Sequence, residues 1–386
     1  MRSDAPWPSS SHGRYSFNNS VSLLTVANQP KLGLCEFVRS GLLHGFDIHI
    51  LGAGMHFRSV LHAMDLKPDL LLNFSQANYA PSCTRKRRAQ KIGRHYYVFA
   101  DAFDVVVQNH AQEVLRQLVQ RGAHKVHFSG ETYLFPNSPP YRDKYPHHLK
   151  RNEKLFCAHK VAQQLPSLGL KPRVCWNATR RDADLTQRLS FPFLNSGMYA
   201  GEKSAVVRLL RAYRRILHSG SRHKGAISDQ AIFHQLHHEG AAAGANGSIA
   251  VDRNASLFLN MCCPSLELLD DFVRHDETRE EKIYIPAVYR GSERWTTRHA
   301  PSLLHWPGST IHKSRAYTRL LSAQKASRRG CAGTVSVHPG IGAPPIDAAA
   351  FLKPCLRTIE ASCTTPMYEM ICSEIVYSEI RDSVYL

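Results

Sequence analysis

Residues 95–104 read HYYVFADAFD, an apolar run that ends in two aspartates separated by two other residues. The density of aromatic and β-branched side chains predicts a buried strand over His95–Ala100. Asp101 and Asp104 follow directly where that strand ends. Because ligands of open α/β sheets bind at the carboxyl ends of the strands, we expect both carboxylates beside a binding site.

Strand and helix patterns alternate on both sides of this stretch, which predicts an α/β fold with a Rossmann-like sheet. Upstream, SLLTVAN (22–28) and FDIHIL (46–51) read as strands joined by a helix from Pro30 to Gly45. Downstream, apolar spacing predicts helices over 114–122, 203–219 and 228–239, and strands at 125–129, 249–252 and 302–304. Residues 59–93 fit no element well, although DLLLNF (69–74) could form a strand.

Regular patterns are confined to residues 20–318, which we expect to form one domain. Residues 1–19 are polar and serine-rich, and we expect them to be disordered. Beyond residue 318 the pattern decays into a stretch rich in glycine and proline, followed by a mixed tail. We therefore expect residues 319–386 to form an irregular C-terminal appendage.

Charge and hydropathy narrow the class of partner. The chain has 386 residues and a formal net charge of +18, which favours anionic partners. The densest basic run, Arg85–Arg88, has no interleaved aromatic residues, so it is interpreted as a solvated loop and no nucleic-acid partner is expected. No run of eighteen apolar residues occurs, so no transmembrane segment is expected. The oligomeric state is not predicted.

Asparagine and cysteine patterns favour the endoplasmic reticulum, the Golgi lumen or secretion. The ten cysteines include no CxxC pair, which argues against a structural zinc site and permits disulfides. Five Asn-x-Ser/Thr sequons begin at Asn18, Asn73, Asn177, Asn246 and Asn254. The N-terminal residues lack the apolar stretch of a secretory signal, so we expect an incomplete N-terminus.

The spacing of Asp101 and Asp104 suits one hard divalent cation that is shared with the phosphate oxygens of a substrate. His305 follows a short predicted strand, and an imidazole would complete an oxygen and nitrogen ligand set suited to manganese. Taken singly, the aspartates could form an Asx turn beside a helix cap, and the histidine could be structural. The combination favours a metal site.

Further polar residues lie at the ends of predicted elements. Glu131 ends the strand after the aspartates, and Asp229 opens a helix, where an acid is commonly a cap. In a cleft these two carboxylates could instead orient an acceptor hydroxyl or stabilise positive charge on a sugar. Asn195, Ser196 and Gly197 are predicted to form a sharp turn whose amide and hydroxyl groups could bind a sugar ring.

The order of the motifs is more specific than any one of them. FADAFDVVV, HFSGE, FLNSGMYAG, SDQAIFHQL, IAVDRNASLFLNM and LLHWPG follow LLTVAN, FVRSG and LGAG. In this order they resemble the glycosyltransferase domain of the procollagen lysyl hydroxylases, over about residues 20–315. The resemblance implies a GT-A fold, UDP-sugar donors, Mn²⁺, and transfer of glucose to galactosyl-hydroxylysine of collagen or, in some members, of galactose.

By position, the resemblance implies that Asp101, Asp104 and His305 hold the metal and that the end of the first strand contacts the uridine. The donor-binding set also includes the tight turn and the last residue of HWPG, and thus comprises Val26, Ala27, Asn28, Asp101, Asp104, Asn195, Ser196, Gly197 and Gly308. Asp229 matches the second acid of the family's Asp-Asp-Gln, near the transferred sugar, and Glu131 is grouped with it as catalytic.

Several positions depart from the family pattern. Ser228 replaces the first acid of Asp-Asp-Gln, HWPG replaces His-Gly-Asn-Gly, and Tyr133 and Phe135 stand where the family prefers tryptophan. The family's lysine-bearing helix before the aspartates has Lys91 as its candidate here. No 2-His-1-carboxylate motif is found, so no hydroxylase domain is expected.

The sequence thus predicts a Mn²⁺-dependent transferase that moves a hexose from UDP-glucose or UDP-galactose to a hydroxyl acceptor, such as hydroxylysine of a collagen-like protein. One alternative is a non-catalytic, UDP-binding relative, which Ser228 and the irregular stretch 59–93 favour. Another is a phosphohydrolase, which would need more metal ligands than these strand ends offer.

Overall fold

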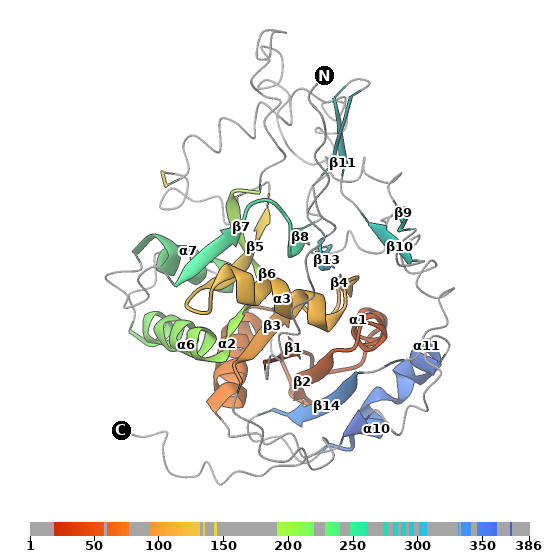
Figure 1. Cartoon of the computed structure of the whole chain (residues 1–386). Coiled ribbons are helices and arrows are strands. Elements are labelled where there is room, and N and C mark those ends of the chain that lie inside the picture. The colour runs from red at the N-terminus through yellow and green to blue at the C-terminus, as the bar shows by residue number, and fades with distance from the viewer. Residues whose placement is uncertain are drawn as a thin grey trace, which may run out of the picture.

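A mixed eight-stranded sheet forms the centre of the molecule, in the order β15-β14-β2-β1-β3-β6-β5-β7 (Figure 1). The computed structural model describes residues 19–57, 60–76, 93–131, 134–135, 143–144, 191–219, 228–239, 248–260, 301–306, 331, 333–340, 346–360 and 371–372, and short strands between 273 and 296. The strands are β1 (Ser20–Val26), β2 (Asp47–Ala53), β3 (His95–Ala100), β5 (Val126–Glu131), β6 (Phe193–Glu202), β7 (Ile249–Asp252), β14 (Thr334–Pro339) and β15 (Ile371–Cys372).

The sheet is parallel except at β6, which runs antiparallel to both β3 and β5. The carboxyl ends of β14, β2, β1 and β3 therefore meet at one edge, together with the amino-terminal end of β6. This mixed sheet, flanked by helices, confirms the predicted α/β class and is consistent with a Rossmann-like GT-A fold.

Helices cover both faces of the sheet (Figure 1). Side chains alternate along β1, so Leu23 packs with α1 (Leu32–Leu43) and α3 (Ala111–Arg121), whereas Leu24 packs on the other face. That second face carries α2 (Val60–Gln76), α6 (Lys203–His218) and α7 (Asp229–Glu239). Among the described helices, none is long and apolar enough to cross a membrane.

A small second sheet lies beside the main one and carries part of the candidate site. It consists of β4 (Val105–Val107), β13 (Leu303–His305) and β8 (Phe258–Asn260), with β13 in the middle. Two hairpins complete the described strands: β9 (Val273–Asp276) with β10 (Glu281–Tyr284), and β11 (Ala287–Arg290) with β12 (Glu293–Thr296).

Two local predictions were wrong. The stretch DLLLNF lies within helix α2, because Leu70, Leu71 and Leu72 are all buried between the sheet and α6. Residues 195–197 form no turn and belong to β6, where the pairing register with β5 shifts between Phe128 and Ser129. A shift of this kind redirects side chains without reversing the chain.

The C-terminal segment, defined here as residues 331–360, is not an irregular appendage. Its strand β14 pairs in parallel with β2, and Val335 and Val337 face the core. α10 (Ala348–Leu352) follows and packs against β14. A 3-10 helix (Lys353–Cys355) and α11 (Leu356–Glu360) come next and pack against α1. The predicted domain boundary at residue 318 is therefore wrong for this segment. The predicted disorder of residues 1–19 stays a prediction, because the structure describes only residue 19 of that stretch.

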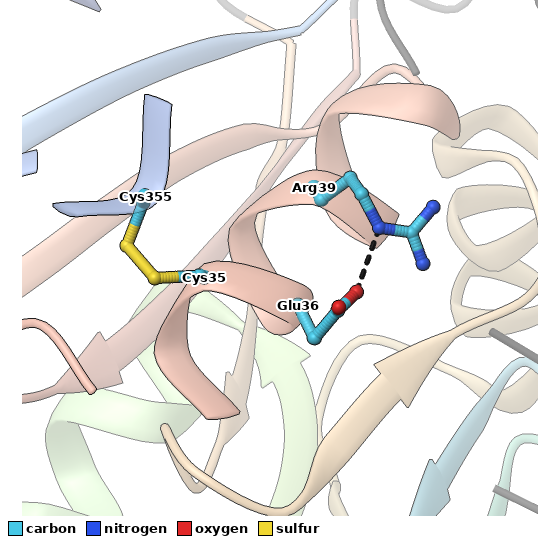
Figure 2. Close-up of a disulfide and its surroundings, with 4 residues drawn as sticks. All are labelled: Cys35, Glu36, Arg39 and Cys355. Carbon is cyan, nitrogen blue, oxygen red and sulfur yellow. Dashed lines mark hydrogen bonds and ion pairs between the residues drawn. A yellow bond between two sulfur atoms is a disulfide. The ribbon is translucent and has the colours of Figure 1, made fainter. Parts of the chain in front are cut away.

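A disulfide between Cys35 of α1 and Cys355 fastens the C-terminal segment to the first helix (Figure 2). The two cysteines are separated by 320 positions in the sequence. One helical turn away, Arg39 and Glu36 form a buried ion pair with 2.7 Å between Nε and Oε2. The disulfide thus joins two distant parts of the chain at a well-packed helix.

Candidate functional site

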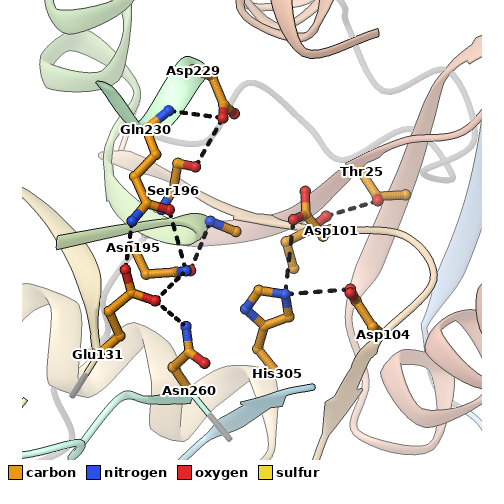
Figure 3. A network of polar contacts seen from close by, with 12 residues as sticks. Thr25, Asp101, Asp104, Glu131, Asn195, Ser196, Asp229, Gln230, Asn260 and His305 are labelled. Carbon is orange, nitrogen blue, oxygen red and sulfur yellow. Dashed lines mark hydrogen bonds and ion pairs between the residues drawn. The ribbon is translucent and has the colours of Figure 1, made fainter. Parts of the chain in front are cut away.

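Asp101, Asp104 and His305 meet at the carboxyl end of β3 (Figure 3). Asp101 follows the last residue of β3, and its backbone N–H donates to the carbonyl of Gly197 in β6 at 2.8 Å. His305 ends β13 and pairs with Val105 of β4, so it lies beside the chain that has just passed Asp104. The Trp306 N–H donates to the Asp104 carbonyl at 2.8 Å and fixes this register.

Distances within this cluster suit a single cation. Nε2 of His305 lies 3.4 Å from Oδ1 of Asp104 and 3.8 Å from Oδ2 of Asp101, and one ligand atom of each residue lies within 4.8 Å of the others. Ligand atoms that share a small divalent ion lie about 3 Å apart, because each is about 2 Å from the ion. Two carboxylates and one imidazole therefore fit a divalent metal, and the identity of that metal belongs to the proposal below.

Gly197 makes room for the histidine. A Cβ atom at position 197 would lie 2.2 Å from Cε1 of His305 and 2.8 Å from its Nδ1. Because real Cβ atoms do not approach other atoms so closely, any side chain here would displace the imidazole. The glycine thus contributes to the metal cluster by its lack of a side chain, in place of the predicted contact with a sugar ring.

Lys67 is a site residue that the sequence analysis missed. Its Nζ lies 2.9 Å from Oδ1 of Asp101 and 2.9 Å from Oδ2 of Asp229, so one ammonium group joins both aspartates. It is presented by α2, where the sequence suggested a strand. The resemblance implied a lysine on a helix before the aspartates, and this signal could have pointed to Lys67. The candidate chosen from the sequence was Lys91, which lies outside the described residues.

Electrostatic coupling extends through this cluster. Burial would lower the pKa of Lys67, but the carboxylates of Asp101 and Asp229 outweigh burial and raise it well above its usual range. Burial raises the pKa of Asp101, and nearby Asp104 adds to this effect against the opposing charge of Lys67. The pKa of His305 is raised because the Asp104 carboxylate outweighs the effect of burial. The side chains of Lys67 and His305 thus lie against several crowded carboxylates, an arrangement that a bound cation would also stabilise.

A second polar network contains Asp229 (Figure 3), the aspartate that pairs with Lys67. Oδ1 of Asp229 accepts hydrogen bonds from the Ser196 hydroxyl at 3.0 Å and from the Gln230 N–H at 2.8 Å. Ser228 acts as the N-cap of α7, since its Oγ accepts from the Ala231 N–H at 3.3 Å. Asp229 is thus held in place by α7, β6 and α2 together.

Glu131 lies deeper in the same network and is 3% exposed. Its carboxylate accepts from Gln230 Nε2 at 2.5 Å, from Asn195 Nδ2 at 3.2 Å and from Asn260 Nδ2 at 3.4 Å. Three amides therefore surround this carboxylate. The geometry favours a role in positioning Gln230 and Asn195 over the predicted role as a catalytic acid.

Asn195 makes hydrogen bonds on both sides of its amide group. Its Oδ1 accepts from the Gly197 N–H at 2.9 Å, and its Nδ2 donates to Glu131. The side chain therefore connects Glu131 to the backbone that supports the metal cluster. Ser196 contacts Asp229 directly, so this stretch of β6 joins the two polar groups.

The end of β1 lies at the same sheet edge as Asp101. Thr25, one position before Val26, donates from Oγ1 to the Ala100 carbonyl at 2.8 Å. Ala27 is buried, while Val26 and Asn28 are partly exposed at the strand end, as expected of residues that contact a ligand. Gly308 and Tyr133 lie outside the described residues, and Phe135 is 47% exposed.

Comparison with known proteins finds a similarity over the first part of the chain. Residues 17–161 match the family model described as PLOD GT domain. This match covers less than half of the chain and shows a similarity of these residues to that glycosyltransferase domain. The chain is also 27% identical, over 133 residues, to the procollagen-lysine,2-oxoglutarate 5-dioxygenase of Drosophila melanogaster.

That alignment covers 34% of this chain and 17% of the relative, so the chain spans a small part of the relative's length. Asp101, Asp104 and Glu131 lie within the residues matched to the PLOD GT domain. Asp229 and His305 lie beyond them, and they join the site through the geometry described above.

Proposed function

We propose that this chain is a Mn²⁺-dependent glycosyltransferase that moves glucose or galactose from a UDP-sugar to a hydroxyl acceptor. The observation that supports this proposal most strongly is the meeting of Asp101, Asp104 and His305 next to the Lys67–Asp229 pair. One group of residues suits a metal-bound diphosphate, and the adjoining group suits the sugar and acceptor.

The side chains of the cluster would divide the work of binding the donor. Asp101, Asp104 and His305 would hold the ion, which when bound supplies charge neutralisation for the diphosphate leaving group. The preference for manganese rests on the mixture of two carboxylates with one imidazole. Lys67 adds an ammonium group at the border between the metal cluster and Asp229, where negative charge develops on the leaving group.

Asp229 would act on the sugar side. Its Oδ1 is held by Ser196 and Gln230, and its Oδ2 lies 2.9 Å from Nζ of Lys67, so the carboxylate keeps one orientation. An anion held in this way stabilises positive charge that develops at the anomeric carbon, and it can orient an acceptor hydroxyl. Glu131 supports this arrangement through Gln230.

The acceptor that we propose is a hydroxyl group on protein or glycan, such as hydroxylysine or galactosyl-hydroxylysine of a collagen-like protein. The match of residues 17–161 to the PLOD GT domain supports this choice. We also propose that the protein works in the endoplasmic reticulum or Golgi lumen, or after secretion. The disulfide Cys35–Cys355 and the exposed sequon residue Asn254 support an oxidising compartment.

The test is release of UDP from UDP-glucose and from UDP-galactose, with Mn²⁺, with and without a hydroxylysine-bearing peptide. We expect turnover that depends on the peptide and that Asp104→Ala abolishes, while Arg208→Ala, on the exposed face of α6, retains it. Equal turnover by Asp104→Ala would show that the site is assigned wrongly. Binding of UDP without release would favour the non-catalytic alternative, and release of inorganic phosphate would favour a hydrolase.

A further inference from the structure

The C-terminal segment reaches the sheet edge at which β1 and β3 end. β14 pairs with β2 along its length, and the N–H of Gly340 donates to the Ala53 carbonyl at 3.3 Å, just past the end of β14 (Figure 1). Ile346 packs onto the next residue of that loop, because a Cβ atom at Gly54 would lie 2.6 Å from its Cδ1. The loop after β2 is therefore covered by residues that lie outside the family match.

The same loop holds the end of β1. The Asn28 amide donates from Nδ2 to the Met55 carbonyl at 3.1 Å, and the Gly54 N–H donates to the Asn28 carbonyl at 3.2 Å. Gly52 and Gly54 have φ angles of 79° and 72°, a conformation that glycine adopts without strain. The tight loop thus fixes the side chain and the backbone of Asn28 from two sides.

Gly340 approaches Met55 too closely for any side chain. A Cβ atom at position 340 would lie 1.8 Å from Cγ and 2.0 Å from Sδ of Met55. The Met55 side chain would have to move, and the carbonyl of the same residue accepts from the Asn28 amide. The path from Gly340 through Met55 to Asn28 is therefore continuous and short.

We propose that Gly340 is a positioning residue for donor binding: it lets Met55 hold Asn28 in the orientation that binds the nucleotide of a UDP-sugar. This inference rests on the proposed function and extends it to the C-terminal segment. It predicts that residues far along the chain from both aspartates set the affinity for the nucleotide without taking part in the transfer step.

The experiment measures binding of UDP with Mn²⁺ by calorimetry, together with the KM for UDP-sugar and kcat. We expect Gly340→Ala to raise Kd and KM about tenfold and to leave kcat within about twofold. In the double variant Gly340→Ala/Met55→Ala the new methyl group finds space, so Kd should return to within about threefold of the wild type. A purely structural role would change stability without this rescue.

Gly333→Ala is the matched control. Gly333 precedes the same strand at the opposite edge of the sheet, and its Cβ would lie 2.0 Å from the Phe46 carbonyl oxygen. This variant should lower Tm and leave Kd for UDP unchanged. The inference is overturned if Gly340→Ala binds UDP like the wild type, if Met55→Ala gives no rescue, or if Gly333→Ala weakens binding equally.

Asn28→Ala keeps the inference testable if Gly340→Ala does not fold. It should raise Kd for UDP about tenfold, and unchanged binding would overturn the inference. Where Gly340→Ala folds, the double variant Asn28→Ala/Gly340→Ala should bind UDP like Asn28→Ala alone, because both changes act on one contact. Additive losses would contradict the proposed path. Absence of UDP binding by the wild type would instead overturn the proposed function, and this inference with it.

Discussion

The two aspartates and the histidine of the metal cluster are positioned in different ways. Asp101 and Asp104 lie in the region matched to the PLOD GT domain, where one strand and its following turn carry both ligands. His305 lies outside that region and depends on the pairing of β13 with β4. Two candidate ligands on one continuous stretch form a sequence motif that comparison can detect. A candidate ligand that is positioned by pairing between distant strands appears in the sequence as one isolated residue. Sequence similarity therefore fades before the geometry of the site does.

The largest expected effect is an equal loss of activity when a candidate ligand is removed inside or outside the matched region. His305→Ala, like Asp104→Ala, should reduce Mn²⁺-dependent UDP release by more than about 100-fold, because loss of a supporting residue around a metal already costs about 10–100-fold in metal affinity or activity. UDP release and Mn²⁺ affinity are the measurements. The exposed His124→Ala is the control. Full activity in His305→Ala would confine the metal site to the matched region.

Removal of the disulfide tests how much the link between the C-terminal segment and the matched region contributes to the free energy of unfolding. Cys355→Ser should lower the free energy of unfolding by about 2–4 kcal/mol, because the unfolded chain is no longer constrained by a long loop. Urea unfolding with and without reductant measures this. Reductant should destabilise the wild type more than it does the variant. An unchanged urea midpoint would show that the segment contributes little to stability.

Lys67 joins the two parts directly, so its removal tests whether they work as one site. Lys67→Met should lower kcat/KM about 10–100-fold, since Asp101 and Asp229 lose the ammonium group that they share. The variant Lys67→Arg, which keeps the charge, should retain more activity than Lys67→Met. Similar activity in Lys67→Met and the wild type would mean that the two aspartates act independently.

The smallest expected effect is a pH dependence of stability from His49 of β2 and His338 of β14, whose ring nitrogens lie 3.2 Å apart. Burial lowers the pKa of His49 to about 3 and that of His338 to about 4. In the unfolded chain both titrate near 6.5, so the unfolded state binds more protons as pH falls from 6.5 towards 4, and stability decreases. Each histidine adds up to about 1.4 kcal/mol per pH unit.

Urea midpoints at pH 7 and pH 5 measure this slope. His338→Asn should reduce the difference between the two midpoints, whereas His124→Asn, at an exposed position, should not. A slope that is unchanged in His338→Asn would mean that His338 binds protons in the folded protein as readily as in the unfolded chain.

Local pattern was sufficient to predict several elements of the matched region. The strand His95–Ala100 was predicted with its observed bounds, and the apolar face of α1, with Leu34, Phe37 and Val38, is fully buried. The grouping of Asp101, Asp104 and His305 was also predicted, from their places at strand ends and from the order of the motifs, and their role as metal ligands stays a prediction. In this strand and this helix, the spacing of apolar residues that predicts the element is also the spacing that buries them in the core.

Other parts could not be predicted because their partners are remote in sequence. α2 contains Pro68 and a run of three leucines, so its helical spacing was hidden, and Lys67 was missed with it. The strand β14 is short and flanked by glycine and proline, and it becomes a strand through pairing with β2, almost 290 residues earlier. Similarly, the amides that surround Glu131 come from three separate elements.

The position of β14 has a consequence for how the protein is made on the ribosome. Until β14 has been synthesised, β2 presents an open strand edge, and Cys35 has no Cys355 with which to pair. Open strand edges promote association between chains. A nascent chain that already contains both aspartates and His305 would thus remain in need of protection by chaperones, and oxidation of this cysteine pair must follow translation of nearly the whole sequence.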